Sequence, residues 1–507
     1  MTTIEGSTVE PGDLLIGSGD FTVSATIDVP DRPASGLGDV AAMFDPGSRR
    51  GWTLGFVDAS PCGNHPNDRE LSFVLEAGTT PRWEDLGRPS ESTLMVAALA
   101  VLEGELYAAT WEGPPSDRGH VYRFDNEGWT DCGIPWNCNA VTRLAVHEGR
   151  LYAGVSRLRG GGSGLPDSTN REPGGRILRY EGGTEWTDLG ALDGADSVAA
   201  LVPWRGDLYA IPMYSEGLFR FVAPGEWAWC GTPGRRLLAL GVHDGALHGA
   251  GNDHADVASA IAQTAAGIVV PARSAEGGGG VFRYEGAESW TCLGLQPDTT
   301  QVYSIETFDG AMHIGTWPTG LVYRHGGDDH WERCGRLGDE TEVMNLLAFG
   351  GNLYGGTLPK AQVFRMHAGD TWVEVGRLDT TPDVLYRRAA SMAVHRGRMV
   401  VGTLPSGRVH AMRVGLGVST GRAISAGSHA IAAIRRGPTV ELHIDGVLAA
   451  AETDTDDETF DLGTLPTMHE GGGPRAPFLG RLRDLHFVQR AMSEGEIAAL
   501  ADPRRES

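Results

Sequence analysis

Five side chains in this sequence have the types needed to remove a proton beside a carboxylate and to stabilise the charge that forms. They are Tyr214, His254, His120, Arg143 and Arg235, and we expect them to be catalytic. An arginine or a protonated histidine can neutralise the carboxylate, while a tyrosine or histidine takes the neighbouring proton and returns one to the leaving oxygen. This set of residues favours β-elimination as the reaction.

Arg143 gives the clearest of these signals, because equivalent positions in six similar segments hold uncharged residues. That position reads Ala98, Arg143, Ala200, Ala239, Ser304, Asn345 and Ser391. A guanidinium in a crowded interior is costly unless it is paired or binds an anion. Both interpretations stay open for Arg143.

We expect the substrate to contact Arg236, Asn345, Trp317 and Trp136.

A Trp followed four residues later by a Gly marks the elements that must hold these side chains. The pair occurs seven times, at Trp83/Gly87, Trp129/Gly133, Trp186/Gly190, Trp227/Gly231, Trp290/Gly294, Trp331/Gly335 and Trp372/Gly376. Each repeat also contains an x-Gly turn, where Gly supplies the positive φ of a two-residue hairpin, and predicts four short strands. Units of this size bury both faces by stacking radially, so the sequence predicts an all-β fold with a seven-bladed β-propeller.

The two ends of the repeat region predict how the ring closes. The first Trp pair precedes the first full repeat, while the last unit, 389–412, has three strands and no Trp of its own. We therefore expect residues near 82–87 to pair with the blade that ends near Met412. This 1+3 closure would remove the open edge of the last blade.

The repeats resemble a divergent kelch propeller. Gly355 and Gly356, Tyr354, Phe364 and Trp372 stand at the positions that are typical of that family. The resemblance covers about 82–412 and implies a fold, since propellers host enzymes, lectins and scaffolds alike. The sequence contains no Ser-x-Asp-x-Gly-x-x-Trp box, which disfavours a sialidase.

Alternating strand patterns at both ends of the chain predict a second domain. Residues 1–80 and 415–507 together resemble the two halves of a laminin-G-like or concanavalin A-like jelly roll. Its opening looks like 19–23 and its ending looks like 480–500. We therefore predict a β-sandwich with its N-terminal half in 1–80 and its C-terminal half in 415–507, and a propeller over 81–414 inserted between them.

Two long segments predict which face of the propeller carries the site. Residues 156–175 and 252–280 join the second strand to the third in their repeats. In a propeller such loops open on the same face as the connections between blades. Long loops in a compact domain are often functional, so we expect the catalytic and binding residues on this face.

These observations favour a carbohydrate-active enzyme, and first of all a lyase that cleaves a uronate-containing oligo- or polysaccharide by β-elimination. Two alternatives stay open. One is a non-catalytic module that binds glycans or proteins, as laminin-G-like sandwiches and kelch-like rings often do. The other is a glycoside hydrolase, which needs two carboxylates at a defined separation.

Composition limits the partners and the compartment. The net charge of −24 argues against nucleic acid, and no apolar run reaches the ~18 residues of a membrane span. We expect an anionic oligo- or polysaccharide as partner, in a monomer or small homo-oligomer. No cofactor is expected, with a structural Ca²⁺ at 252–256 as an alternative. The absence of Lys and Arg before Arg32 argues against a signal peptide, and the starting Met favours a cytoplasmic protein over the mature form of a secreted one.

Overall fold

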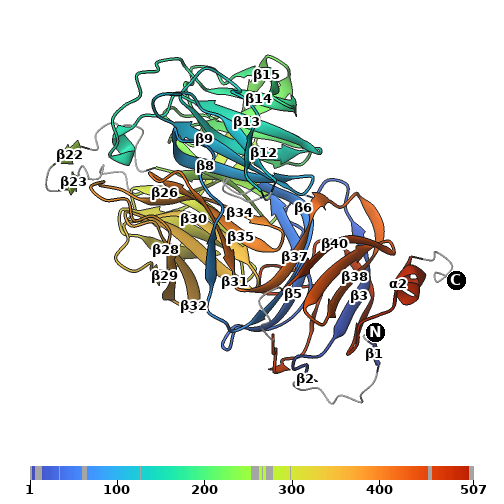
Figure 1. The fold of residues 1–507 in the computed structure, drawn as a ribbon. Coiled ribbons are helices and arrows are strands. Elements are labelled where there is room, and N and C mark those ends of the chain that lie inside the picture. The colour runs from blue at the N-terminus through green and yellow to red at the C-terminus, as the bar shows by residue number, and fades with distance from the viewer. Residues whose placement is uncertain are drawn as a thin grey trace.

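The computed structural model describes residues 3–5, 14–33, 35–59, 66–125, 127–252, 262–264, 267–269, 278–296, 299–454 and 460–501. Regular structure in these ranges is almost entirely β (Figure 1). The exceptions among the described residues are a 3-10 turn, η1 (Gly161–Ser163), and a helix, α2 (Glu494–Leu500), whose Ser493 and Glu496 form a capping box. The predicted all-β fold class is confirmed.

Strand pairing divides residues 82–413 into seven antiparallel units of four strands each, as far as the described residues show, and two of these units join in one larger sheet. The first three blades are β8 (Thr93–Leu102), β9 (Glu105–Glu112), β10 (Val121–Phe124) and β11 (Trp129–Asp131); β12 (Ala140–His147), β13 (Arg150–Ser156), β14 (Arg176–Gly182) and β15 (Glu185–Ala191); and β16 (Val198–Trp204), β17 (Asp207–Pro212), β18 (Phe219–Ala223) and β19 (Glu226–Trp229).

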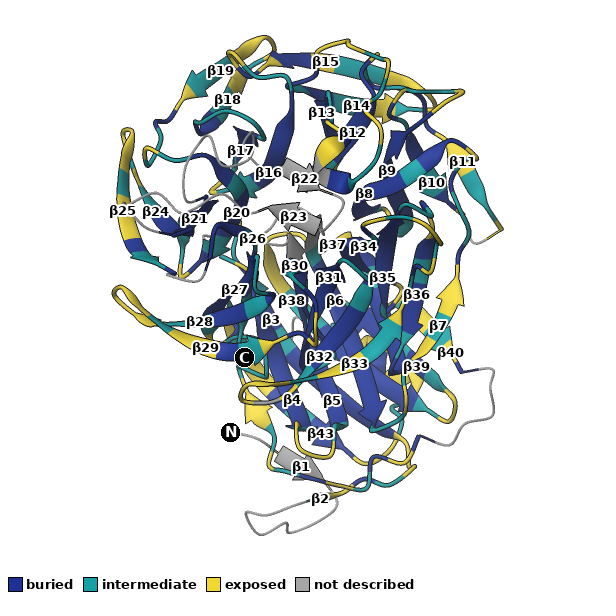
Figure 2. Ribbon diagram, turned by 90° about the vertical axis from the view of Figure 1, so that its left-hand side faces the viewer, coloured by how far each residue is buried: buried dark blue, intermediate teal, exposed yellow. Residues whose placement is uncertain are grey.

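The fourth to sixth blades are β20 (Leu237–His243), β21 (Ala246–Gly251), β24 (Gly280–Gly286) and β25 (Ser289–Leu295); β26 (Gln301–Phe308), β27 (Ala311–Trp317), β28 (Leu321–Gly327) and β29 (His330–Arg336); and β30 (Glu342–Phe349), β31 (Asn352–Leu358), β32 (Gln362–Ala368) and β33 (Thr371–Arg377). A small hairpin of β22 (Ala262–Thr264) and β23 (Gly267–Val269) lies between β21 and β24 in sequence. The blades surround a common axis, with the first strand of each blade innermost (Figure 2).

The seventh blade closes the ring in the predicted way. It consists of β34 (Arg388–His395), β35 (Arg398–Leu404), β36 (Val409–Arg413) and β7 (Arg82–Asp85). The outer strand β7 pairs with β36, and Met412 stands opposite Trp83. Residues from the two ends of the repeat region therefore share one sheet, and the prediction of 1+3 closure is confirmed.

The segments outside the ring form two facing sheets. One contains β1 (Thr3–Glu5), β43 (Arg481–Val488), β3 (Phe21–Val29), β38 (Gly427–Arg436), β39 (Thr439–Ile444) and β40 (Val447–Thr453), and the other contains β37 (Gly415–Ala423), β6 (Pro66–Ala77), β5 (Arg50–Ala59), β4 (Asp39–Asp45) and β42 (His469–Glu470). The short strands β2 (Leu14–Leu15) and β41 (Thr464–Leu465) also pair. Both sheets mix strands from the two ends of the chain. The likeness to a jelly roll and the domain boundaries stay predictions.

Aromatic side chains from both ends of the chain fill the space between these two sheets. Trp52 on β5 and Phe487 on β43 stack with ring centroids 6.2 Å apart, and both are fully buried. Phe21 and Phe73 complete the same cluster. Packing of this kind ties the N-terminal and C-terminal segments into one core.

The sandwich covers the face of the ring that carries the x-Gly hairpins, here called the hairpin face. Gly104 donates its backbone N–H to Gly421 at 2.8 Å, Asp309 donates to Pro474 at 2.9 Å, and Gly245 donates to the Ser35 hydroxyl at 2.8 Å. These contacts come from blades one, five and four. The opposite face, with the long loops, is here called the loop-rich face.

The repeated Trp residues bind each blade to the blade before it. The Trp Nε1 donates to the carbonyl of the residue three places after the preceding Trp. Six of these bonds are present among the described residues, from Trp83 to Val375, Trp129 to Leu86, Trp186 to Cys132, Trp227 to Leu189, Trp331 to Leu293 and Trp372 to Cys334, at 2.6 to 3.0 Å. Trp290 Nε1 lacks a partner in the described part of the chain.

In six of the seven pairs, all except Trp83/Gly87, the Gly makes room for the next Trp hairpin. A Cβ on Gly231 would lie 2.7 Å from Cα of Glu288, and a Cβ on Gly294 would lie 2.7 Å from the Asp329 carbonyl oxygen. At the closure, a Cβ on Gly376 would overlap Nε1 of Trp83. The spacing of the pair thus follows from the contact between neighbouring blades.

Gly376→Ala is expected to lower the free energy of unfolding by about 1–3 kcal/mol, because the added methyl group would push Trp83 away from its carbonyl partner. Gly376 has an ordinary negative φ, so the effect would be steric. Gly128→Ala is the matched control, since a Cβ there meets nothing within 4 Å and φ is again ordinary. Equal melting temperatures for the two variants would contradict this account of closure.

Candidate functional site

Polar side chains from consecutive blades meet near the axis at the loop-rich face. The register of strands one and two places Arg236, Gln301, Glu342 and Arg388 at equivalent positions in blades four to seven, where the innermost strands begin. Blades one and two hold Met95 and Ala140 there. We call Tyr214, Arg236, Tyr303, Glu342, Tyr386 and Arg388 the axial cluster.

Glu342 is the carboxylate of the axial cluster. Glu342 is only 4% exposed, and its Oε1 has no hydrogen-bond partner among the described residues. Burial raises the pKa of Glu342 to about 7, although the nearby Arg388 guanidinium acts in the opposite direction. A buried carboxylate with an unused oxygen can gain or lose a proton near neutral pH.

Three tyrosines face the same region. The Tyr303 hydroxyl donates to Oε1 of Gln301, and burial together with the Glu342 charge raises the pKa of Tyr303. Burial also raises the pKa of Tyr386 and of Tyr214. The Tyr386 hydroxyl is buried and has no partner in the described ranges. All three hydroxyls therefore keep their protons at neutral pH and can act as hydrogen-bond donors.

Arg236 supplies a buried positive charge. The residue is 3% exposed, and its Nη1 donates to the Met213 carbonyl at 2.6 Å. Burial lowers the pKa of Arg236, while Tyr303 and Tyr214 raise it. Tyr214 belongs to blade three and Tyr303 to blade five, so Arg236 lies between these two blades. Arg388 is the cation that acts directly on the Glu342 carboxylate, whereas Arg236 interacts with the tyrosines of the cluster.

The Tyr214 ring is held by the long loop of the second blade. The Arg159 backbone N–H donates to the Tyr214 hydroxyl at 3.2 Å, and the Arg159 guanidinium lies 4.2 Å from the ring centroid. Arg159 also lies 3.8 Å from an Asp196 carboxylate oxygen. The loop therefore positions one residue of the axial cluster directly.

The same loop covers the apolar side of the axis. Leu158 and Leu165 pack against a buried group that includes Met95 and Ala390. At Gly164 a Cβ would lie 3.1 Å from Leu385 and 3.3 Å from Tyr386, so the loop reaches from blade two to blade seven. Asp117 anchors the loop through a set of hydrogen bonds from Ser168, Thr169 and Asn170. One side of the axis is thus closed by apolar residues and the other carries the axial cluster.

Two of the residues expected from the sequence, Tyr214 and Arg236, belong to the axial cluster. Arg143 and Arg235 instead donate to backbone carbonyls. Arg143 bonds to Thr142 at 2.6 Å and to Ala199 in the next blade. Arg235 bonds to Asn252 at 3.1 Å and Gly278 at 3.2 Å, at the base of the long loop of blade four. Their predicted catalytic roles stay predictions.

The remaining expected residues lie around this region. Asn345 donates to the Ala389 carbonyl at 3.1 Å, and Trp317 is 3% exposed. Trp136 donates to the Pro173 carbonyl at 3.1 Å, with the Arg176 guanidinium 4.5 Å from its ring centroid.

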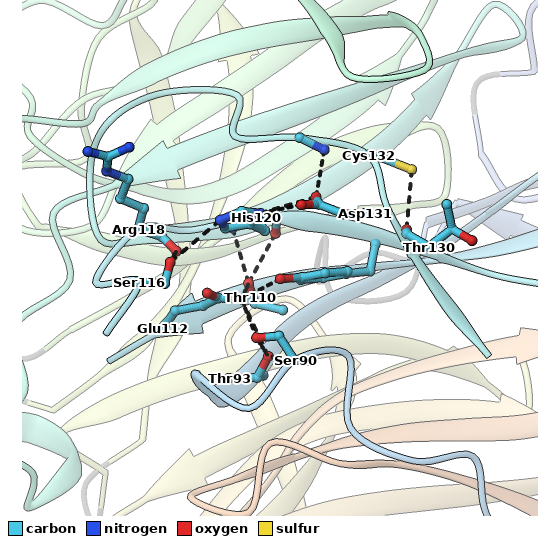
Figure 3. Close-up of polar contacts among 12 residues, drawn as sticks. Ser90, Thr93, Thr110, Glu112, Ser116, Arg118, His120, Thr130, Asp131 and Cys132 are labelled. Carbon is cyan, nitrogen blue, oxygen red and sulfur yellow. Dashed lines mark hydrogen bonds and ion pairs between the residues drawn. The ribbon is translucent and has the colours of Figure 1, made fainter. Parts of the chain in front are cut away.

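His120 and His254 were also expected to be catalytic. His120 lies in blade one, in a separate hydrogen-bonded group (Figure 3). His254 lies outside the described residues.

Sequence reasoning missed Tyr303, Glu342, Tyr386 and Arg388. A signal for two of them, Glu342 and Arg388, was present at the residue that precedes the Arg143 position by three. This residue changes from apolar or small types to charged and polar ones along the chain. That position, at the strand start, reads Met95, Ala140, Ser197, Arg236, Gln301, Glu342 and Arg388. Tyr303 stands two residues after the strand start in blade five, and Tyr386 stands two residues before the strand start in blade seven.

Two further observations concern metal ions and membranes. In the described part of the chain, no group of three or more His, Cys, Asp or Glu side chains could hold a metal ion. Among the helices of the same residues, none is long and apolar enough to cross a membrane. The expectations about a cofactor, Ca²⁺, partners and compartment stay predictions.

Solved structures similar to this chain include β-propellers with little sequence identity. A virginiamycin B lyase from Staphylococcus aureus, in complex with quinupristin, aligns at a TM-score of 0.47 and 10% identity over 66% of this chain and 99% of that one. The WD40 β-propeller domain of Doa1 aligns at 0.41 and 11% identity, over 66% and 97%. YCF48 bound to a D1 peptide aligns at 0.40 and 10% identity, over 66% and 96%. No protein-family model matches the sequence, and no curated protein matches it.

Glu342→Gln is expected to become more stable relative to the wild type as the pH rises. In the unfolded chain the carboxyl loses its proton near the ordinary glutamate pKa of 4.5, and in the folded protein near 7, so ionisation between these values favours unfolding of the wild type alone. The gain from about pH 5 to about pH 8 should be on the order of 2 kcal/mol. Thermal or denaturant unfolding at both pH values measures it, and a constant difference would contradict the burial of a carboxylate here.

Proposed function

We propose that the protein is a lyase that cleaves a uronate-containing oligosaccharide by β-elimination, with the axial cluster as its active site. The observation that carries this proposal is the buried carboxylate of Glu342, which has an unused oxygen and lies beside Tyr303 and Arg388 at the loop-rich end of the axis. The cluster contains a base, hydroxyl donors and two cations, which are the groups that this reaction needs.

Glu342 is the proposed base. Its Oε1 can accept the proton on the carbon next to the uronate carboxylate, since no described residue already donates to it. A base is most effective when its pKa lies close to the working pH, and the pKa of Glu342 near 7 meets this condition. Few water-exposed carboxylates would be basic enough for the same task.

Arg236 and Arg388 are the proposed partners of the substrate carboxylate. With Glu342 ionised, one negative and two positive side chains leave the cluster with a surplus of one positive charge. A uronate residue carries one negative charge and would balance it. Removing a proton beside that carboxylate builds up further negative charge on its oxygens, which the guanidinium groups would stabilise.

Tyr303 or Tyr386 would complete the reaction. As Glu342 takes the C–H proton, the bond between the next carbon and the glycosidic oxygen breaks, and a double bond forms in the uronate ring. The departing oxygen takes a proton from a tyrosine hydroxyl, which the raised pKa of both tyrosines keeps in place until that moment. Transfer of the proton from Glu342 back to the tyrosinate restores the enzyme, so atoms and charges balance.

A glycoside hydrolase is less well supported by the same geometry. The neighbouring acid, Glu340, accepts from the Thr357 hydroxyl at 2.8 Å and from the Lys360 backbone N–H at 2.9 Å. These bonds use its Oε2 to hold the adjacent loop of blade six. Its buried Oε1, which like that of Glu342 accepts no hydrogen bond from a described residue, lies 3.9 Å from Nζ of Lys360. Because both oxygens face this loop, Glu340 is poorly placed to act as the second catalytic acid.

The test is the ultraviolet absorbance of the unsaturated product during incubation with a panel of uronate oligosaccharides. The wild type should produce it, and Glu342→Gln should lower kcat by at least about 100-fold, since the general base is lost. Glu374→Gln is the matched control on the outer strand β33, where the side chain is exposed and bonds to Gln362 at 2.6 Å.

The outcomes of this assay separate the proposed function from its alternatives. Loss of product in Glu342→Gln alone would support the lyase. A flat trace with calorimetric binding of the same sugars would support a non-catalytic glycan-binding module. A flat trace without binding would overturn the proposal that the axial cluster recognises a uronate.

The pH profile provides a second test. Because Glu342 must be ionised to accept a proton, kcat/KM should rise with pH and level off above about 7, the pKa of this carboxyl. Initial rates in buffers of constant ionic strength would measure the profile. A rate that falls as the pH rises through 7 would exclude Glu342 as the base.

A further inference from the structure

A serine, a histidine and an aspartate form a hydrogen-bonded chain in blade one, apart from the axial cluster. The Ser116 hydroxyl oxygen lies 3.5 Å from Nε2 of His120 and 3.4 Å from the Arg118 carbonyl oxygen, so its proton has two acceptors within reach (Figure 3). Nδ1 of His120 lies 3.1 Å from Oδ1 and 3.2 Å from Oδ2 of Asp131. Ser116 and His120 belong to the turn between β9 and β10, and Asp131 ends β11. This is the order of groups that activates a serine for attack on an ester.

The hydrogen-bond partners determine which nitrogen of His120 carries the proton. An ionised carboxylate only accepts hydrogen bonds, so Nδ1 must donate to Asp131. In the neutral imidazole Nε2 then presents its lone pair to Ser116. His120 is therefore in the tautomer that can take the serine proton.

The His120 ring is held in this orientation by its neighbours. It stacks on Tyr122 with ring centroids 5.5 Å apart and an angle of 17° between the planes. The backbone N–H of His120 donates to the Thr110 hydroxyl at 3.1 Å. Tyr122 in turn donates to the buried Glu112 at 2.9 Å. A base fixed by stacking and hydrogen bonds loses little freedom when it acts.

The turn that carries Ser116 is also fixed. The next residue, Asp117, has a φ of 52°, a left-handed conformation that is uncommon outside glycine. Its carboxylate accepts from the Ser168 hydroxyl at 2.6 Å and from the Thr169 hydroxyl at 2.9 Å, both in the long loop of blade two. The loop thus holds the turn in the conformation that directs Ser116 toward His120. Ser116 itself remains partly exposed.

The sandwich contains a similar chain of Ser425, His429 and Asp445 that differs in one respect. Nδ1 of His429 lies 2.8 Å from Asp445, but its Nε2 lies 3.1 Å from the Ser425 carbonyl oxygen as well as 3.2 Å from the hydroxyl. A carbonyl oxygen also only accepts, so both ring nitrogens of His429 act as donors. His429 therefore has no lone pair for a serine proton, whereas His120 does.

We propose that Ser116 is the nucleophile of a second active site, which hydrolyses short carboxylic esters. The Ser116 oxygen attacks the acyl carbon while His120 takes its proton, and collapse of the tetrahedral adduct expels the alcohol, which takes the proton back. Water then attacks the acyl-serine with the same help from His120, releasing the acid. Ester and water are consumed, and acid and alcohol are formed, with no other reactant. This site does not depend on the function proposed for the axial cluster.

A fluorophosphonate probe, which reacts with activated serines, tests the nucleophile. Wild-type protein should be labelled, with the modified peptide containing Ser116, and should hydrolyse p-nitrophenyl acetate. Ser116→Ala should lose the label, and both Ser116→Ala and His120→Gln should lower the ester hydrolysis rate by at least about 100-fold. Ser425→Ala is the matched control and should keep both activities.

The labelling experiment can overturn the proposal. A label that maps to another serine, or one that survives in Ser116→Ala, would exclude Ser116 as the nucleophile. The absence of labelling in folded wild-type protein would do the same. Circular dichroism and thermal unfolding of each variant would separate a loss of folding from a loss of reactivity.

Asp131 acts in this proposal as a positioning residue. Asp131→Asn removes the charge that holds the proton on Nδ1 of His120, so the labelling rate should fall by about tenfold or more. The ¹⁵N shifts of the His120 ring should at the same time show more of the Nε2-protonated tautomer. A slower reaction with an unchanged tautomer would show that Asp131 only supports the turn.

Discussion

The bond from a Trp indole to a carbonyl of the preceding blade, present for six of the seven repeated Trp residues among those described, is the contact on which the other features of the propeller depend. It joins neighbouring sheets through a polar bond inside an otherwise apolar contact, where a hydrogen bond is both directional and costly to lose. The Gly of the pair lets the two hairpins approach closely enough for the bond to form. Since the bonds set the spacing of the blades, they also set how closely residues of different blades approach at the axis.

The arrangement of the two sheets at the ends of the chain explains why the two faces of the ring differ. The sandwich bonds to hairpins of several blades, so it covers the hairpin face and leaves the opposite, loop-rich face uncovered by its sheets. The long loop of blade two lies on that open face, where it contacts blade seven. The covered face contributes to stability, and the open face holds both groups of residues to which chemistry has been assigned.

The fold could be predicted well because most copies of the repeat use Trp and Gly for the same contact. The site was harder, because the axial cluster takes one or two residues from each of blades three to seven, and their types change from copy to copy. A bulge in each innermost strand adds to the difficulty, since it shifts the register between Val302 and Ser304 and between Val343 and Asn345. Arg143, the residue that stands out in the sequence, lies after the bulge in its strand. Glu342 and Arg388 lie before the bulge in theirs.

The closure by β7 has a consequence for the order in which the chain can fold during synthesis. β7 leaves the ribosome more than three hundred residues before β36, its only neighbour in the described sheet. Strands β3 and β6 are separated from their partners β38 and β37 by even longer stretches of chain. Until the last segment emerges, these early strands have exposed edges and apolar faces that invite wrong pairing. A cell that makes this protein must therefore keep its nascent N-terminal segment from aggregating, so its yield will depend on chaperones and on the rate of translation.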